Sequence, residues 1–212
     1  MTARATSPVT PLSFPAIRVR RYLGPWNIPT GRLVLGSMKW LWWAPLFAVL
    51  AHIMEEFVYP GGFANWDRAY RPQYRSSITS RVHIVVNAAL IALCVSVAAG
   101  ASGGELSIGA VRLRSFLPAE YAVAGWLALG ALLFANAIFH IKGTLATKRV
   151  SPGVRTGVLF YIPLSAYGFW HFISTGSISF GAALAAALVG GSYEVWAWLL
   201  HRVRGGHDEV QA

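Results

Sequence analysis

Long apolar segments alternate with short polar ones along most of the chain. A helix needs about 20 mostly apolar residues to cross a bilayer. Apolar segments near this length lie at 37–59, 82–100, 116–141, 154–173 and 178–200. The links between them are short and rich in Gly, Ser, Pro, Lys and Arg. The pattern therefore predicts an all-α membrane protein, a bundle of about five transmembrane helices.

The same pattern divides the chain into a bundle and two ends. Residues 1–36 are rich in Pro, Ser, Thr and Arg and show no apolar core of a signal peptide, so we expect a mobile tail that partly lies at the membrane surface. Residues 37–201 form the predicted bundle, and residues 202–212 a short polar C-terminal tail. We find no internal repeat, which argues against a transporter built from inverted repeats.

Composition and charge agree with a membrane protein. Hydrophobic residues make up 55% of the 212-residue chain and charged residues only 12%. Roughly a quarter of the residues are charged in soluble domains. The net charge of +10 comes from basic residues that lie almost wholly outside the apolar segments, where they meet anionic headgroups. We therefore expect these basic residues to interact with the lipid bilayer and not with nucleic acid. The single cysteine excludes a disulfide framework and a thiolate metal cluster.

Ionisable residues inside the apolar segments carry the functional signal. Half of the 8 acids and five of the 6 histidines lie in these segments or at their ends. A charge near the bilayer centre costs roughly 2.5 to 3.5 kcal/mol, so each of these side chains needs a partner. In the first segment His52, Glu55 and Glu56 are three and four residues apart, which places them on one helix face.

Helix direction brings polar residues of the other segments to the same level. Because adjacent helices alternate in direction, the ends of the first, third and fifth segments share one side of the membrane with the starts of the second and fourth. His83 and Asn87 are four residues apart, as are Asn136 and His140, so the members of each pair share a helix face. The polar residues at this level outside the first segment are His83, Asn87, Asn136, His140, Tyr161 and Glu194.

Imidazole and carboxylate side chains together suit iron, manganese or zinc. Facing helices that supply several of each are typical of dinuclear carboxylate sites in bundles, although the Glu-x-x-His order of those proteins is reversed here. Alternatively to a place in this site, the Glu56 side chain reaches the membrane–water interface. Asn87 and Asn136 are weak ligands, groups that orient an imidazole, or hydrogen-bonding residues between helices. The core of the predicted site consists of His52, Glu55 or Glu56, His83, His140 and Glu194.

The segment HIMEE, from His52 to Glu56, resembles a family of bacterial membrane proteins named for an H-x-x-E-E motif. A later Asn-x-x-x-His, Asn136 to His140, and the HIKGT segment followed by an SPG turn extend the resemblance, which runs from about residue 40 to residue 200. The resemblance implies a shared site and supplies no reaction.

The site and its lipid surroundings favour a membrane-embedded metalloenzyme. The first hypothesis is a centre with two iron ions that hydroxylates or desaturates a lipophilic substrate. Tyr161 would donate a hydrogen bond or a proton there, and Glu55 and Glu56 would bind metal or transfer protons. Electrons would come from a partner, since the sequence has no flavin, haem or iron–sulfur signature.

Two alternatives remain open on the sequence. Zinc or another Lewis acid would activate water, and with Glu55 or Glu56 as general base the site would hydrolyse or isomerise a lipid. A proton- or cation-coupled carrier would use the same side chains as a relay. Lys and Arg in the short loops place the site on the cytoplasmic side of a bacterial inner membrane.

Overall fold

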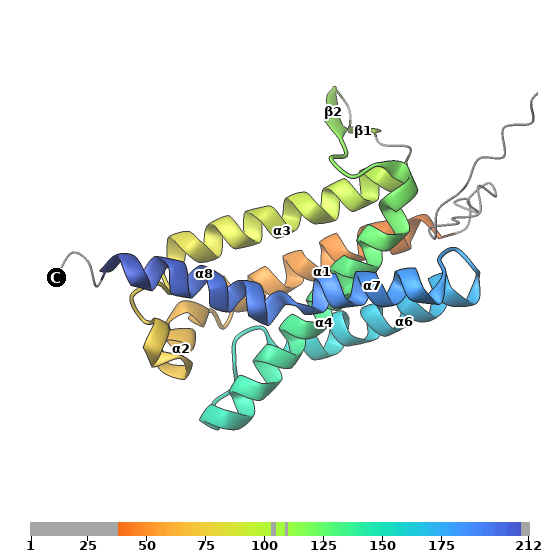
Figure 1. The fold of residues 1–212 in the computed structure, drawn as a ribbon. Coiled ribbons are helices and arrows are strands. Elements are labelled where there is room, and N and C mark those ends of the chain that lie inside the picture. Colours follow the sequence, from red (N-terminus) through yellow and green to blue (C-terminus); the bar gives the residue numbers. More distant parts are fainter. Residues whose placement is uncertain (1–37, 103–104, 109, 209–212) are drawn as a thin grey trace, which may run out of the picture.

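The structure is a computed structural model that describes residues 38–102, 105–108 and 110–208, most of them helical (Figure 1). The expected N-terminal tail, 1–36, lies outside the described residues. Short helical turns are labelled η. The elements are α1 Lys39–Phe57, α2 Phe63–Tyr70, η1 Pro72–Tyr74, α3 Ser80–Ala101, β1 Glu105–Ile108, β2 Val111–Arg114, η2 Ala119–Tyr121, α4 Ala122–Thr147, α5 Val154–Thr156, η3 Gly157–Tyr161, α6 Ile162–Ser174, α7 Phe180–Gly191 and α8 Tyr193–Asp208.

Helices occupy all of the apolar segments predicted from the sequence, and the all-α prediction is confirmed in this respect. Among the residues that the structure describes, three stretches are long and apolar enough to cross a membrane: Ser80–Ala101, Ala122–Thr147 and Phe180–Leu200. In the segment predicted at 154–173, α5, η3 and α6 follow one another directly, with a π-helical turn at Gly157–Tyr161. Pro163 follows this turn and has no N–H for a regular helical bond, which accounts for the irregular winding. A bundle of five crossings stays a prediction.

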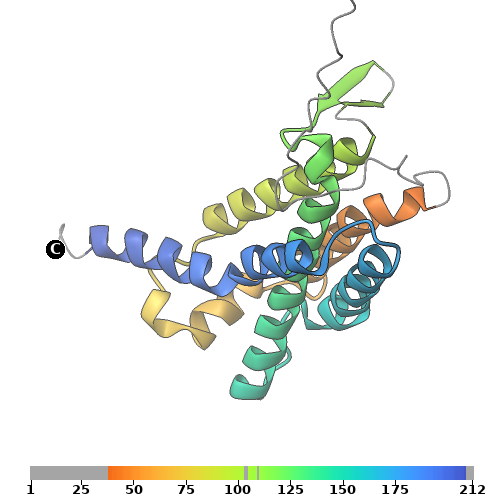
Figure 2. The same cartoon turned by 45° about the vertical axis from the view of Figure 1, so that its right-hand side comes forward.

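Several boundaries and elements differ from the sequence expectation. The third helix begins at Ala122, after Pro118, and continues to Thr147, although the apolar run predicts 116–141. The last predicted span is divided, because α7 ends at Gly191 and α8 runs from Tyr193 to Asp208. The loop expected after α1 contains α2 and η1. An antiparallel hairpin, β1 and β2, projects beside the end of α3 and the start of α4 (Figure 2).

Trp126 of α4 is the centre of the core. Its side chain is fully buried, and its indole N–H donates to the Leu41 carbonyl of α1 at 2.9 Å. A Cβ atom at Gly168 would collide with the indole ring, so this glycine lets α6 approach α4. Ser165 of α6 donates to the Gly130 carbonyl of α4 at 2.7 Å. These contacts hold α1, α4 and α6 together around one tryptophan.

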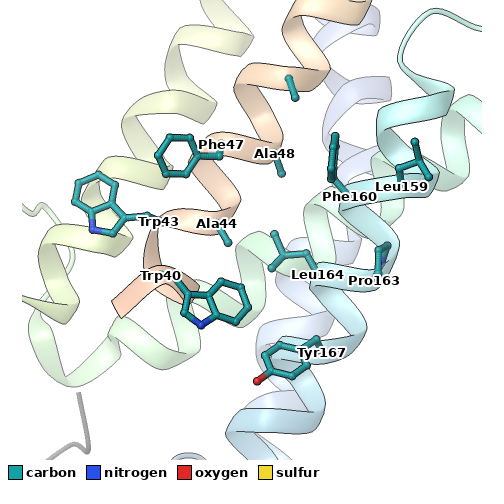
Figure 3. Close-up of a pocket in the computed structure, with 11 residues that line it drawn as sticks. Trp40, Trp43, Ala44, Phe47, Ala48, Leu159, Phe160, Pro163, Leu164 and Tyr167 are labelled. Atoms are coloured by element: carbon teal, nitrogen blue, oxygen red, sulfur yellow. The ribbon is translucent and has the colours of Figure 1, made fainter. Parts of the chain in front are cut away.

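An apolar groove of about 540 Å³ runs along the outside of the bundle between α1 and the η3–α6 segment (Figure 3). Trp40 and Tyr167 stack across it, with ring centroids 5.8 Å apart. Phe47 and Leu159 line it and are largely exposed. Large exposed apolar side chains are typical of a surface that faces lipid chains, so the groove agrees with a membrane location.

Candidate metal centre

Two histidines and one glutamate meet inside the bundle. His52 and Glu56 lie one helical turn apart near the end of α1, and His140 comes from the last part of α4. The Nε2 atoms of His52 and His140 lie 3.4 Å and 3.3 Å from the same oxygen, Oε1 of Glu56. One ligand atom from each residue lies within 4.8 Å of the other two, and all three residues are buried. This group of three is the candidate metal centre.

The two Nε2 atoms are buried and make no hydrogen bond within the described part of the chain. Their approach to Glu56 therefore lacks the alignment of a hydrogen bond, and burial of unpaired polar atoms is costly. Nitrogen and oxygen atoms that converge in this way are able to act as ligands of a common ion. The residues fit a metal ion of the kind that imidazole and carboxylate select.

Hydrogen bonds on the far side of each ring fix its orientation. His52 Nδ1 lies 2.9 Å from the Thr156 hydroxyl, and His140 Nδ1 lies 2.8 Å from the Ser151 hydroxyl. The Thr156 hydroxyl donates its own proton to Glu55 at 2.6 Å, so it accepts from His52 Nδ1–H. The lone pair of His52 then lies on Nε2, toward Glu56. Metal-binding histidines typically have such an outer partner, which fixes the tautomer.

Glu55 anchors the segment that carries Thr156. Its carboxylate accepts from the Thr156 hydroxyl at 2.6 Å and from the backbone N–H groups of Thr156 and Arg155 at 2.8 Å and 3.2 Å. These N–H groups belong to the first helical turn after Gly153, where a negative charge is favourable. The structure thus gives Glu55 a role in positioning and does not bring it into the group of three.

The SPG turn packs directly on the two imidazoles. Gly153 has φ +99°, which favours glycine. A Cβ atom there would lie 2.6 Å from Cε1 of His52 and 2.8 Å from Cε1 of His140. The segment 151–156 therefore supplies both hydroxyl partners and a close-fitting backbone to the site.

Two of the ligands predicted from the sequence lie elsewhere. His83 Nε2 is 3.9 Å from Oδ2 of Asp67, whose carboxylate is held by Arg71 through two bonds of 2.7 Å and 2.6 Å. Glu194 accepts from Lys142 Nζ at 2.9 Å, with both side chains about half exposed. The structure does not bring Glu194 to the group, since it begins α8 after the break from α7.

A cavity of about 360 Å³ adjoins the candidate centre. The predicted site residues Tyr161, Asn136, Asn87 and His83 line it together with His52 and Glu56. The Tyr161 ring packs on His52, with centroids 4.6 Å apart. Asn136 Nδ2 donates to the Tyr193 hydroxyl at 3.3 Å. These residues therefore share one cavity with His52 and Glu56 of the candidate centre.

The sequence reasoning missed the residues that support the site. Ser151, Gly153 and Thr156 lie in and just after the link between the third and fourth apolar segments, and the Ser and Thr hydroxyls there are the available signal. Asp67 and Arg71 are four residues apart, a spacing that forms ion pairs on helices, but the segment was expected to be a loop.

The fold and the site define a helical protein with candidate membrane spans and a buried His–Glu group able to hold a metal ion. The chain belongs to the family described as "Protein of unknown function with HXXEE motif", whose model matches residues 43–168. The matched segment contains the group of three, both hydroxyl partners and Tyr161, and it ends before Glu194. No curated protein and no solved structure shows a significant match.

Proposed function

We propose that the protein is a membrane-embedded metalloenzyme that binds one iron ion and oxidises a lipophilic substrate by hydroxylation or desaturation. His52, Glu56 and His140 would hold the ion. Two imidazoles and one carboxylate with open positions are the ligand set of non-haem iron oxygenases. The sequence suggested two ions, but the group that the structure brings together offers three ligands, which suit one ion.

The proposal rests on the way in which His52, His140 and Glu56 converge. Two buried Nε2 atoms without a hydrogen-bond partner among the described residues approach one carboxylate oxygen, inside apolar helices. A bound ion would satisfy all three atoms and neutralise the carboxylate. When bound, iron would supply activation of dioxygen, the co-substrate of such oxidations.

The carboxylates of Glu55 and Asp67 do not supply the general base that hydrolysis needs. Hydrolysis by a bound ion needs a general base near the activated water. Glu55 accepts three hydrogen bonds from the 155–156 segment, and both oxygens of Asp67 bind Arg71. Neither carboxylate is free to take a proton. Tyr161, which packs on His52 at the cavity, would donate a hydrogen bond to a group beside the ion.

A zinc-dependent lipid hydrolase or isomerase is the second candidate. Zinc accepts the same two histidines and glutamate. His83 lines the cavity and has Asp67 behind it at 3.9 Å, an arrangement suited to a base. Zinc in the purified protein would make this the leading candidate.

The oxidative function implies further partners. Reduction of dioxygen requires electrons from a separate electron-transfer protein. We place the enzyme in the bacterial inner membrane with its site toward the cytoplasm, because Lys and Arg are enriched in the nearby short loops. The lipophilic substrate would reach the site from the bilayer.

Lipid analysis of bacteria that express the protein tests this function. We expect lipids that have gained one oxygen atom or lost two hydrogen atoms with the wild type, and none with His140→Ala. His171→Ala is the matched control, because this histidine stacks on Tyr167 and lies outside the group. Hydrolysed lipids in place of oxidised ones would contradict the oxidative proposal and support the zinc enzyme.

A further inference from the structure

The cavity beside the metal centre contains two polar atoms that a metal ion does not explain. The Tyr161 side chain is fully buried, and the Oδ1 atom of Asn136 is also shielded from solvent. Neither the Tyr161 hydroxyl nor this Oδ1 has a hydrogen-bond partner among the residues that the structure describes. Both residues line the cavity. Buried polar atoms are rarely left unpaired, so each calls for an explanation.

The two atoms have complementary hydrogen-bonding character. Nδ2 of Asn136 is engaged by the Tyr193 hydroxyl, so the free atom of the amide is Oδ1, an acceptor. The Tyr161 hydroxyl is able to donate. A ligand that satisfies both atoms must accept one hydrogen bond and donate another. A hydroxyl group does both with one oxygen atom, whereas an ionised carboxylate only accepts and an ammonium group only donates.

Asp67, Arg71, His83 and Asn87 add polar groups to the lining, and the remaining side of the cavity is apolar and reaches the outer surface. Leu90 and Leu93 of α3 and Ala197 of α8 line it. Its lining residues Val86 of α3 and Trp196 of α8 are 41% and 65% exposed, so the cavity opens between these two helices. Both residues belong to candidate membrane spans. The opening therefore faces the region of the lipid chains.

We infer that this cavity binds a long-chain alcohol. The hydroxyl oxygen accepts a hydrogen bond from Tyr161, the hydroxyl proton is donated to Oδ1 of Asn136, and the hydrocarbon chain lies between α3 and α8. The volume of about 360 Å³ lies in the range of small-molecule sites. The inference rests on the proposed function in one respect: the alcohol is the substrate class that the metal centre would oxidise.

Three probes of equal heavy-atom count that differ in hydrogen-bonding ability test the inference: dodecan-1-ol, the ether 1-methoxyundecane and the alkane tridecane. Native mass spectrometry of the full chain released from detergent gives the affinity for each. We expect the alcohol to bind about tenfold more tightly than the ether, and the ether about tenfold more tightly than the alkane, since each step removes one buried hydrogen bond. Equal affinities for the three probes in the wild type would overturn the inference.

Two variants assign the hydrogen bonds. Tyr161→Phe removes the donor. We expect it to lower the affinity for the alcohol and for the ether about tenfold and to leave the affinity for the alkane unchanged. Asn136→Leu removes the acceptor and is expected to abolish the preference for alcohol over ether. Tyr167→Phe is the matched control, because its hydroxyl lies at the outer groove (Figure 3). Unchanged selectivity in both cavity variants would overturn the assignment.

Metal content measured on the same samples separates the two proposals. Retention of metal by Tyr161→Phe shows that the variant is folded, and its ligand affinities then bear on the alcohol site alone. Wild-type protein that binds metal but does not discriminate among the probes contradicts the alcohol site only. Protein that discriminates but binds no metal contradicts the proposed enzyme and leaves the alcohol site standing.

Discussion

Glu55 and Glu56 are adjacent in the sequence, yet their carboxylates have separate partners. Glu55 accepts hydrogen bonds from the 155–156 segment, whereas Oε1 of Glu56 lies 3.3 Å from Nε2 of His140. The two glutamates of the H-x-x-E-E motif thus have different roles. Glu55 anchors the segment that orients His52, and Glu56 faces the two imidazoles.

This division predicts different effects of equivalent substitutions. Glu56→Gln removes a ligand charge and is expected to abolish stoichiometric metal binding. Glu55→Gln keeps the ligands but weakens the bonds to Thr156, so we expect a metal affinity reduced about 10- to 100-fold, the usual effect of an outer partner. Metal titration of both purified variants measures the difference. Equal losses would contradict separate roles.

Gly153→Ala is expected to disrupt the centre. The new Cβ would lie 2.6 Å from Cε1 of His52, and the residue would also adopt φ +99°. Gly176→Ala is the control, because Gly176 has φ +67° and no atom within 4 Å of its Cβ position in the described residues. Both variants should lose about 1 to 2 kcal/mol of stability, because alanine is strained at positive φ. Only Gly153→Ala should lose metal; retention there would show that the turn does not touch the site.

The Thr156 hydroxyl is expected to set the orientation of His52. Thr156→Val keeps the shape but removes the acceptor of His52 Nδ1–H and the donor to Glu55. We expect metal affinity to fall about 10- to 100-fold. Thr156→Ser restores the hydroxyl and should restore affinity. A serine variant no better than the valine variant would mean that the methyl packing, and not the hydroxyl, matters.

His83 and Glu194 were expected to be ligands from the sequence, and the structure predicts otherwise. His83→Ala and Glu194→Gln should both retain the metal, because His83 faces Asp67 and Glu194 pairs with Lys142. His83→Ala is expected to lower turnover, since this side chain lines the cavity. Metal content and lipid oxidation of the two variants provide the check. Loss of metal from either variant would show that the replaced residue is a metal ligand.

Much of the site follows from spacing and hydropathy. The four-residue interval from His52 to Glu56 fixes a common helix face, which the structure confirms. The alternation of helix direction brings the end of α4 beside the end of α1, so His140 was also predictable. Both arguments need only helix geometry and the positions of the apolar segments.

The supporting residues could not be predicted in the same way. Ser151 and Thr156 act through single hydroxyl groups in a turn, which has no periodic pattern. The prediction for Glu194 requires that the segment 178–200 forms one straight helix. The helix is interrupted between Gly191 and Tyr193, and a single polar residue, Ser192, is not enough to predict this interruption. The different surroundings of Glu55 and Glu56 depend on contacts about 100 positions away in the chain.

The metal content of the purified protein tests whether His52, Glu56 and His140 hold an ion. Elemental analysis by plasma mass spectrometry is made on detergent-purified wild-type protein, His140→Ala and the control His171→Ala. We expect about one iron ion per chain in the wild type and the control, as one set of three ligands implies, and little or none in His140→Ala. Folded protein without metal, or a His140→Ala variant that keeps its ion, would contradict the central claim and turn attention to a proton- or cation-coupled carrier.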